Sequence, residues 1–203
     1  MPAPVLSEIR VAADPDSWAA AGWAVDAGST IVGGVSIEFV AGESGIVDWA
    51  LTDVKAARID GLPTRLGASP DSGSSVHTNG ATAIDHVVVL TPRLERTVEA
   101  LERSGIELRR IREGDTGLGS FRQAFFRAGR PIVEVVESVE LDDSAPARFW
   151  GITFTTTDID AAAELLGDKL GSVKPAVQPG RRIATVRKEA GLGLPVALIS
   201  PKA

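Results

Sequence analysis

The most constraining feature of this chain is an internal repeat in its second half. Residues 84–140 read as a strand, a helix and three further strands, and residues 149–200 repeat that order. Corresponding positions lie 65 residues apart at the first strand (His86 and Gly151) and 63 at the last (Glu134 and Ala197). One such unit leaves a face of its small sheet bare, so it must pack against or pair with its neighbour. We therefore predict an α+β fold built from two paired βαβββ units that form a curved-sheet cleft.

Local patterns support each unit. Ile84–Leu90 is an apolar run of strand length, and Leu94, Val98 and Leu101 follow at helical spacing after the helix-start signal Thr91-Pro92. In the second unit Asp158 is a candidate N-cap, and Ile159, Ala162 and Leu166 mark one helical face. The other expected strands are 107–112, 121–127, 131–139, 149–155, 171–177, 182–187 and 195–200.

The first part of the chain carries a fainter version of the same design. Residues 67–82 are rich in Gly, Ser, Pro and Asp, which predicts a linker between an N-terminal domain (1–66) and a C-terminal domain (83–203). We interpret residues 1–66 as a truncated, related βαβββ-like module. Its expected elements are strands 6–13, 30–40 (two strands) and 46–52 and short helices 16–23 and 54–58.

Composition excludes several classes of function. The chain has 203 residues, a net charge of −6 and no run of about 18 apolar residues that could cross a bilayer. An acidic chain lacks the broad basic surface of a non-specific nucleic-acid binder. The absence of cysteine excludes disulfides and thiolate metal sites, and the opening residues do not resemble a secretory signal. We expect a bacterial-type cytoplasmic protein with no nucleic-acid or membrane partner.

Two titratable residues stand in otherwise apolar strand faces. Alternation places His86 with Ile84, Val88 and Leu90, and places Glu134 with Ile132 and Val136. A buried carboxylate must be paired, protonated or bound to a metal, because leaving it bare costs several kcal/mol. His86 and Glu134 are therefore candidates for half of a metal site. The alternative is a buried ion pair, or a histidine that hydrogen-bonds a backbone carbonyl.

At these residues the chain resembles the vicinal oxygen chelate superfamily, the glyoxalase and bleomycin-resistance-like proteins. The match consists of Ile84-Asp85-His86-Val87-Val88 leading into a helix, Ile132-Val133-Glu134-Val135-Val136 closing the unit, and the second copy that follows. The resemblance implies a U-shaped cleft and, in the enzymes, one divalent ion held by first-strand and last-strand positions of both units. We expect a largely apolar cleft lined by Val88, Leu90, Phe125, Ile132, Val136, Phe154 and Ile199.

Carried over by position, the resemblance makes His86 and Glu134 the metal ligands of the first unit. The matching positions of the second unit are Gly151 and Ala197, which have no side-chain donor. Catalytic zinc generally takes three protein ligands, and non-haem iron enzymes use two His and one carboxylate. A third donor from Glu8, Glu38 or Asp48 is a further option.

Candidate ligand-binding residues come from the basic and aromatic positions near the cleft strands. Arg122 and Arg182 are candidates because a guanidinium suits carboxylate and phosphate groups, and Trp150 is one because it adjoins the strand glycine Gly151. Ordinary alternatives are a solvated strand face for the arginines and packing for the tryptophan.

Two functional hypotheses follow. The first is a glyoxalase-like protein with a degenerate metal site that binds a small organic molecule, including an anionic one, in its cleft. The second is a divalent-metal-dependent lyase, isomerase or dioxygenase whose ion binds His86 and Glu134. No catalytic residue is assigned. An exposed sheet edge in the N-terminal part also allows a homodimer.

Overall fold

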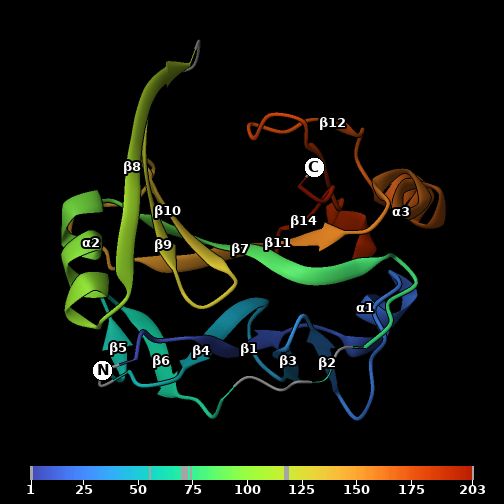
Figure 1. The fold of residues 1–203 in the computed structure, drawn as a ribbon, viewed down its shortest axis with the longest axis horizontal. Helices are drawn as coiled ribbons and strands as arrows, with labels where there is room; N and C mark the ends of the chain where they lie inside the picture. Colours follow the sequence, from blue (N-terminus) through green and yellow to red (C-terminus); the bar gives the residue numbers. More distant parts are fainter. Residues whose placement is uncertain (1, 55, 70–72, 74, 117–118, 203) are drawn as a thin grey trace.

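The computed structural model describes residues 2–54, 56–69, 73, 75–116 and 119–202. Within these residues the strands form two sheets that lie face to face as two layers (Figure 1). The lower layer in that view is the N-terminal sheet, with strand order β2-β3-β1-β4-β6-β5. Its strands are β1 (Leu6–Ala12), β2 (Ser29–Val32), β3 (Val35–Val40), β4 (Gly45–Leu51), β5 (Arg58–Ile59) and β6 (Leu62–Leu66), and helix α1 (Pro15–Ala20) follows β1.

The upper layer is the C-terminal sheet, with strand order β12-β13-β14-β11-β7-β10-β9-β8. Its first unit contains β7 (Ala81–Thr91), α2 (Leu94–Arg103), β8 (Glu107–Thr116), β9 (Gly119–Arg127) and β10 (Ile132–Glu137). Its second unit contains β11 (Arg148–Thr156), α3 (Ile159–Leu166), β12 (Lys174–Pro175), β13 (Arg182–Thr185), β14 (Val196–Ile199) and the short 3-10 turns η1 (Gly167–Lys169) and η2 (Lys188–Ala190).

Strand pairing shows that both sheets follow one plan. In the C-terminal sheet the first and last strands of each unit pair in parallel (β7 with β10, β11 with β14), and β7 pairs antiparallel with β11 at the centre. The N-terminal sheet repeats this in shortened form, because β1 pairs in parallel with β3, β4 with β6, and β1 antiparallel with β4. The predicted fold class, paired βαβββ units preceded by a truncated related module, is confirmed.

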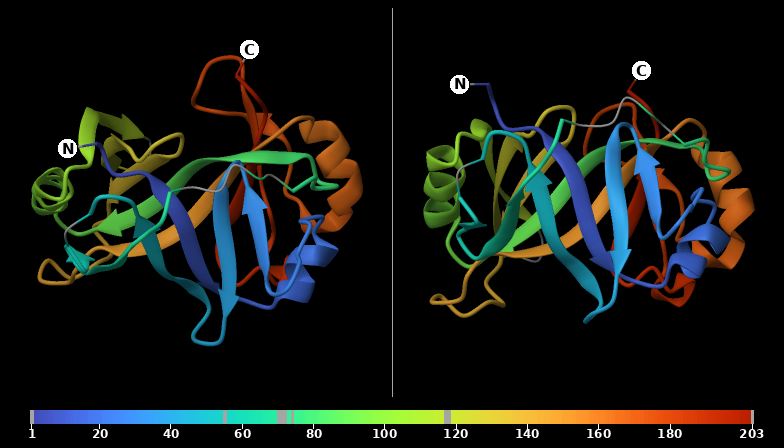
Figure 2. Two further views of the ribbon diagram at one scale, coloured as in Figure 1. Left: turned by 60° about the horizontal axis from the view of Figure 1, so that its bottom comes forward. Right: turned by 90° about the horizontal axis from the view of Figure 1, so that it is seen from below.

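The hydrophobic core fills the space between the two sheets, whose strands cross obliquely in Figure 2. Phe154 from β11 is fully buried there, with its ring centroid 6.0 Å from that of Trp18 and 5.3 Å from that of Trp23. At the other end Trp49 from β4 packs edge-on against Phe149. The N-terminal sheet therefore covers one face of the C-terminal sheet and leaves the opposite face to form the cleft.

One expectation for the N-terminal part needs correction. Residues 54 and 56–58 form no helix, and the chain instead makes the hairpin β5–β6 around Asp60 and Gly61, both with positive φ. Asp-Gly is a strong sign of a two-residue hairpin turn, so the sequence did contain this information. In the predicted linker, residues 70–72 and 74 lie outside the described residues. Its end is well fixed, because His77 Nδ1 accepts a hydrogen bond from Ala24 N at 3.0 Å and its Nε2 lies 3.1 Å from Ile31 O.

No helix among the described residues has both the length and the apolar character needed to span a membrane.

The packing of Phe154 yields a prediction about stability. Phe154→Ala removes a fully buried ring that contacts Trp18 of α1 and Trp23 just after it, so it should lower the free energy of unfolding by about 3–5 kcal/mol in urea titrations. Val177→Ala, at a side chain that is 74% exposed, is the control and should change little. Equal effects of the two substitutions would contradict a shared core between the sheets.

Candidate functional site

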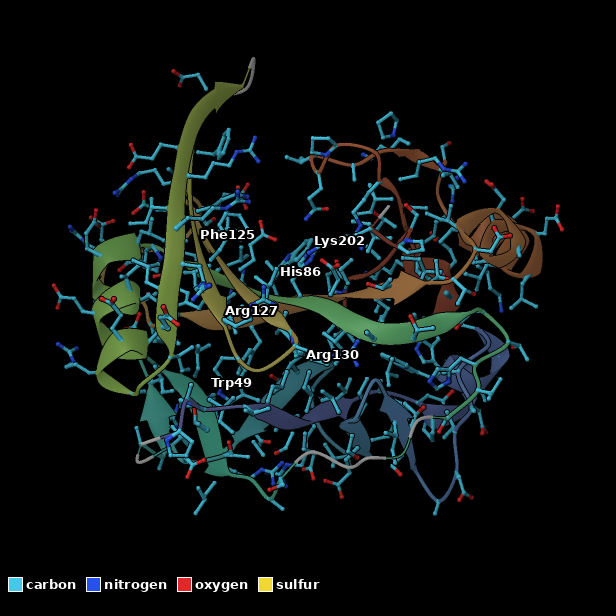
Figure 3. All side chains as sticks on the ribbon, viewed as in Figure 1. Trp49, His86, Phe125, Arg127, Arg130 and Lys202 are labelled. Atoms are coloured by element: carbon cyan, nitrogen blue, oxygen red, sulfur yellow. The ribbon has the colours of Figure 1, made fainter. Side chains whose placement is uncertain are left out.

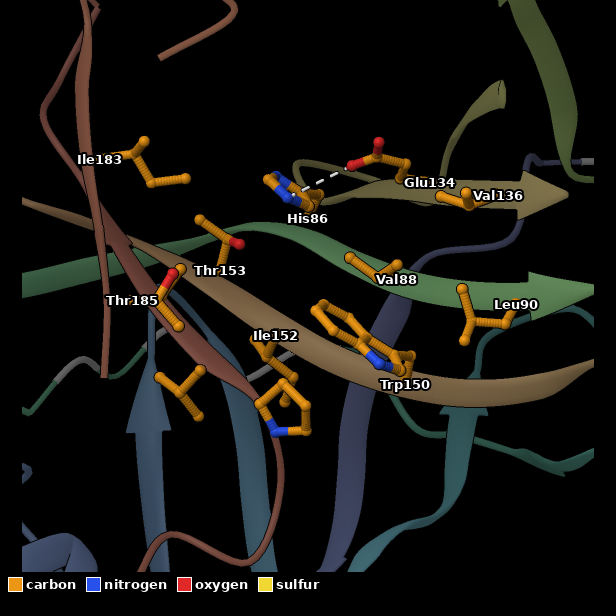
Figure 4. A pocket seen from close by; sticks show the side chains of 13 residues that line it. His86, Val88, Leu90, Glu134, Val136, Trp150, Ile152, Thr153, Ile183 and Thr185 are labelled. Atoms are coloured by element: carbon orange, nitrogen blue, oxygen red, sulfur yellow. Dashed lines mark ion pairs between the residues drawn. The ribbon is translucent and has the colours of Figure 1, made fainter. Parts of the chain in front are cut away.

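The free face of the C-terminal sheet contains a cavity of about 390 Å³ near its centre (Figure 4). Strands β7, β10, β11, β13 and β14 supply its lining, so both units contribute. The lining residues are His86, Val88, Leu90, Glu134, Val136, Trp150, Ile152, Thr153, Ile183, Thr185, Pro195, Val196 and Ala197. The predicted positions of Val88, Leu90 and Val136 in the cleft are confirmed. That of Phe154 is wrong, because this side chain lies in the core between the sheets.

A β-bulge in β7 sets the shape of the site and reverses the expected face of Ile84. Thr153 pairs with His86 but the next residue, Phe154, pairs with Ile84, so Asp85 is an extra residue on β7. Directly paired residues share a face, which puts Ile84 and Phe154 toward the other sheet and His86 and Thr153 toward the cavity. A bulge presents two residues against one, and Asp85 accordingly lies on the same side as His86. Strict alternation cannot predict this reversal.

His86 is held between two carboxylates. Its Nδ1 lies 2.9 Å from Asp85 Oδ2, and its Nε2 lies 3.3 Å from Glu134 Oε2. The side chains are largely buried, with exposed fractions of 13% for His86, 8% for Asp85 and 17% for Glu134. Asp85 in turn accepts a 2.7 Å hydrogen bond from Arg181 Nη1. The result is a chain of contacts from Arg181 through Asp85 and His86 to Glu134.

The two carboxylates have opposite electrostatic environments. Burial alone would raise the pKa of Asp85, but hydrogen bonds from His86 and Arg181 outweigh it and lower the pKa to about 2. Burial raises the pKa of Glu134, and the positive charges of His86 and Arg112 offset this only in part. Gln123 Nε2 donates to Glu134 Oε1 at 2.9 Å and fixes the carboxylate beside the ring. Asp85 is thus a permanent anion that orients His86, whereas Glu134 is an acid that keeps its proton more readily.

The structure does not bring the predicted residues Arg122 and Arg182 to the cavity. Arg122 lies on the α2 side of the sheet, where it pairs with Glu95, Glu113 and Glu137 at 2.6, 2.9 and 3.4 Å. Arg182 pairs with Asp160 of α3 at 2.7 Å and is 48% exposed. Their neighbours in sequence, Gln123 and Arg181, are the ones that face the site.

Trp150 does line the cavity and keeps 46% of its surface exposed. It is the extra residue of a second bulge, since Phe149 pairs with Val89 and Gly151 with Val88. Gly151 is required here because a Cβ atom at this position would lie 2.4 Å from the carbonyl oxygen of Pro195. A backbone approach, and not a ligand, therefore explains this glycine.

Strand register supports the positional match between the two units. Glu134 pairs with Val88, two residues after His86, and Ala197 pairs with Thr153, two residues after Gly151. Gly151 and Ala197 therefore occupy the positions of His86 and Glu134 in the second unit. At position 151 the lack of a donor follows from the fold, because a Cβ atom there would collide with the backbone of Pro195.

The donor set does not fit the divalent ion that the resemblance implies. His86 Nε2 and a Glu134 oxygen can converge on a cation, but Asp85 contacts the other ring nitrogen and Arg181. Asp48 and Glu8 pair with Arg10 and Arg65 on the N-terminal sheet, and Glu38 lies on that sheet as well. Across the described parts of the chain, no group of three or more His, Cys, Asp or Glu side chains converges as a metal site requires.

Sequence reasoning did not assign a role to Arg110 and Arg112 of β8. Arg110 pairs with Phe125, which pairs with Glu134, and Arg112 pairs with Gln123, which pairs with Val136. Both guanidinium groups therefore stand on the cleft face, over the rings of Phe125 and Phe121 at 4.6 and 5.0 Å. Neither forms an ion pair or hydrogen bond within the described residues. The sequence offered one sign of this arrangement, namely a run of arginines in one expected strand and phenylalanines in the next.

The two carboxylates predict opposite effects of neutral substitutions. Because the pKa of Asp85 lies below its ordinary 3.8, its charge stabilises the fold above about pH 4, and this is lost toward pH 2. Asp85→Asn should lower the free energy of unfolding at pH 7 by about 2 kcal/mol, with a smaller difference in acid. Because burial raises the pKa of Glu134, its negative charge destabilises the fold at pH values above its ordinary pKa of 4.5. Glu134→Gln should therefore stabilise the protein at pH 7 and lose that gain in acid.

Urea unfolding of both variants between pH 2.5 and 7 measures the two effects, because about half of this pH range lies below the ordinary pKa of glutamate. The same sign for both substitutions at pH 7 would contradict the assigned environments.

Comparison with known proteins places the fold. No known protein family matches the sequence, and no curated protein matches it significantly. A 4-hydroxymandelate synthase variant from Streptomyces coelicolor is 13% identical with a TM-score of 0.65, over 100% of this chain and 94% of that one. A fusion of a xylose isomerase-like TIM barrel with a 4-hydroxyphenylpyruvate dioxygenase is 16% identical with a TM-score of 0.64, over 100% of this chain and 50% of the fusion.

A methylmalonyl-CoA epimerase from Mycobacterium tuberculosis is 16% identical over 61% of this chain and 91% of that one, and its TM-score of 0.49 is too low to add to the argument. The two matches that extend over the whole chain include both sheets. At identities this low they show the fold and not the activity. The chain therefore has the two-sheet fold expected from its resemblance to the vicinal oxygen chelate proteins.

Proposed function

We propose that this protein binds a small organic molecule in the cavity beside His86 and Glu134, without a resident metal ion. The observation that carries the proposal is the composition of the cavity. Its walls are mainly apolar, from Val88, Leu90, Val136 and Trp150, and its few polar side chains are His86, Glu134, Thr153 and Thr185. An apolar pocket with a few fixed polar groups is the usual form of a site for a small organic ligand.

The cavity has room for an elongated ligand. A neighbouring cavity of about 590 Å³ shares Trp150, Thr185 and Pro195 with it and extends over residues 185–188 and 191–195. Trp150 stands where the two cavities meet. A half-exposed indole at this position supports stacking against a flat organic group.

Arg110 and Arg112 support an anionic ligand. Both lie on β8, two strands beyond the cavity-lining strand β10 and on the same face, with no ion-pair partner among the described residues. The phenylalanine rings beneath them hold the guanidinium groups in place, which reduces the entropy lost on binding an anion. A carboxylate or sulfonate on the ligand would complement this wall.

The alternative, a metal-dependent lyase, isomerase or dioxygenase, requires the cleft to bind a cation. Asp85 fixes His86 through Nδ1, as a carboxylate beside a ligating histidine does, and this favours the alternative. The unit-two positions Gly151 and Ala197 weigh against it, because two donors fall short of the usual three.

Fluorescence titration with two related dyes tests the proposal. 8-Anilinonaphthalene-1-sulfonate carries an anionic group, and N-phenyl-1-naphthylamine is its neutral counterpart. Wild-type protein should bind both saturably, and Ala197→Phe, which fills the cavity from β14, should weaken both about tenfold or more. Arg110→Gln with Arg112→Gln should weaken only the sulfonate, by about tenfold.

Val139→Phe is the matched control, since it adds the same ring at a position that is 97% exposed. Melting temperatures of all variants separate lost binding from lost folding. Equal dye affinity in Ala197→Phe and wild type would refute binding in this cavity. Dye binding that needs added Mn²⁺ and is lost in His86→Ala would favour the metal-dependent alternative.

A further inference from the structure

A second, polar pocket of about 260 Å³ opens on the other side of Asp85 from the cavity. Three cationic side chains from separate segments line it: Arg127 at the end of β9, Arg130 in the turn before β10, and Lys202 after β14. Figure 3 labels these three residues and His86 around the middle of the C-terminal sheet. The pocket is independent of the cavity proposed above, and the two share no lining residue.

The charge of this pocket is strongly positive although the protein is acidic. Its lining contains Arg127, Arg130, Arg181 and Lys202 against the single carboxylate of Asp85, a balance of four positive and one negative charge. Asp85 is already engaged by Arg181 and His86. Among the residues that the structure describes, Arg127, Arg130 and Lys202 have no ion-pair partner. Four cations near one another repel, which favours an anion between them.

The backbone around the pocket is held in place. Arg181 is 3% exposed and donates through Nε to Ser200 O at 2.7 Å, while Ser200 N donates to Arg182 O at 2.8 Å. These bonds fasten the segment that carries Lys202 next to Asp85. On the opposite side Arg127 Nη1 donates to Arg130 O at 3.2 Å and Ala128 N to Pro131 O at 3.1 Å, which shapes the turn.

We infer that this pocket is an anion site for a phosphate group, of free phosphate or of a small organic phosphate, bound by Arg127, Arg130 and Lys202. A guanidinium donates paired N–H groups that match the spacing of phosphate oxygens, and a lysine adds a point charge. The hydroxyl of Thr155 and the buried Arg181 add polar groups that suit an oxyanion, and the apolar side chains of Ile84, Ile132 and Pro201 complete the lining.

Isothermal titration calorimetry with inorganic diphosphate tests the site. Wild-type protein should bind it saturably at low ionic strength, and Arg127→Gln with Arg130→Gln should weaken binding about tenfold or more. Arg93→Gln with Arg103→Gln removes the same charge from side chains that are 57% and 71% exposed near α2, and should leave the affinity within about twofold. Phenyl phosphate and inorganic phosphate, titrated separately, distinguish an organic from a free phosphate by which one binds more tightly.

No saturable binding to wild-type protein, or an equal loss in both double variants, would overturn the inference. The melting temperature of each variant, together with its binding of the neutral dye, verifies that the fold and the cavity are intact. A negative result with diphosphate does not contradict ligand binding in the cavity. Ala197→Phe changes only the cavity, whereas Arg127→Gln with Arg130→Gln changes only the pocket.

Discussion

The extra residue in β7 is the constraint on which the site depends. In a regular strand Asp85 and His86 would face opposite sides of the sheet, and Asp85 would point into the core between the sheets. A carboxylate there would have no water and no partner, at a cost of several kcal/mol. The bulge turns Asp85 to the cleft side, where Arg181 neutralises it and His86 donates to it. One local irregularity thereby creates the chain of contacts from Arg181 to Glu134.

The two faces of the C-terminal sheet have different roles because the N-terminal sheet packs against only one of them. Because the N-terminal part covers one face with Trp49 of β4 and with Trp18 and Trp23 in and just after α1, the opposite face is free to be hollow and partly polar. The two units then differ in chemistry although they share a plan. The first carries His86 and Glu134, while the second supplies a wall whose Gly151 lies too close to Pro195 for any side chain. The asymmetry is thus steric at position 151, whereas Ala197 borders the open cavity.

The sequence was sufficient for the repeat, for most strand positions and for the common face of His86 and Glu134, because period and polarity are local properties. It was insufficient wherever the face that a side chain occupies depends on the pairing of its strand with a neighbouring strand. Ile84 and Asp85 changed face through a bulge that depends on how β7 pairs with β11. The choice between Arg181 and Arg182, or between Arg122 and Gln123, could not be made because both members of each pair are polar. The hairpin at Asp60-Gly61 is different, since its turn motif was present and a helix was expected instead.

The central claim is that His86 is fixed by two carboxylates and not by a metal ion, and nitrogen NMR of the imidazole rings tests it most directly. The chain has two histidines, which simplifies assignment. His77 accepts a hydrogen bond at Nδ1 from Ala24 and should be protonated at Nε2, so it provides an internal reference. The account predicts that His86 of protein as purified carries a proton on Nδ1, bound to Asp85, with no change on adding a chelator. A metal-bound imidazole spectrum for His86 that the chelator removes would contradict it.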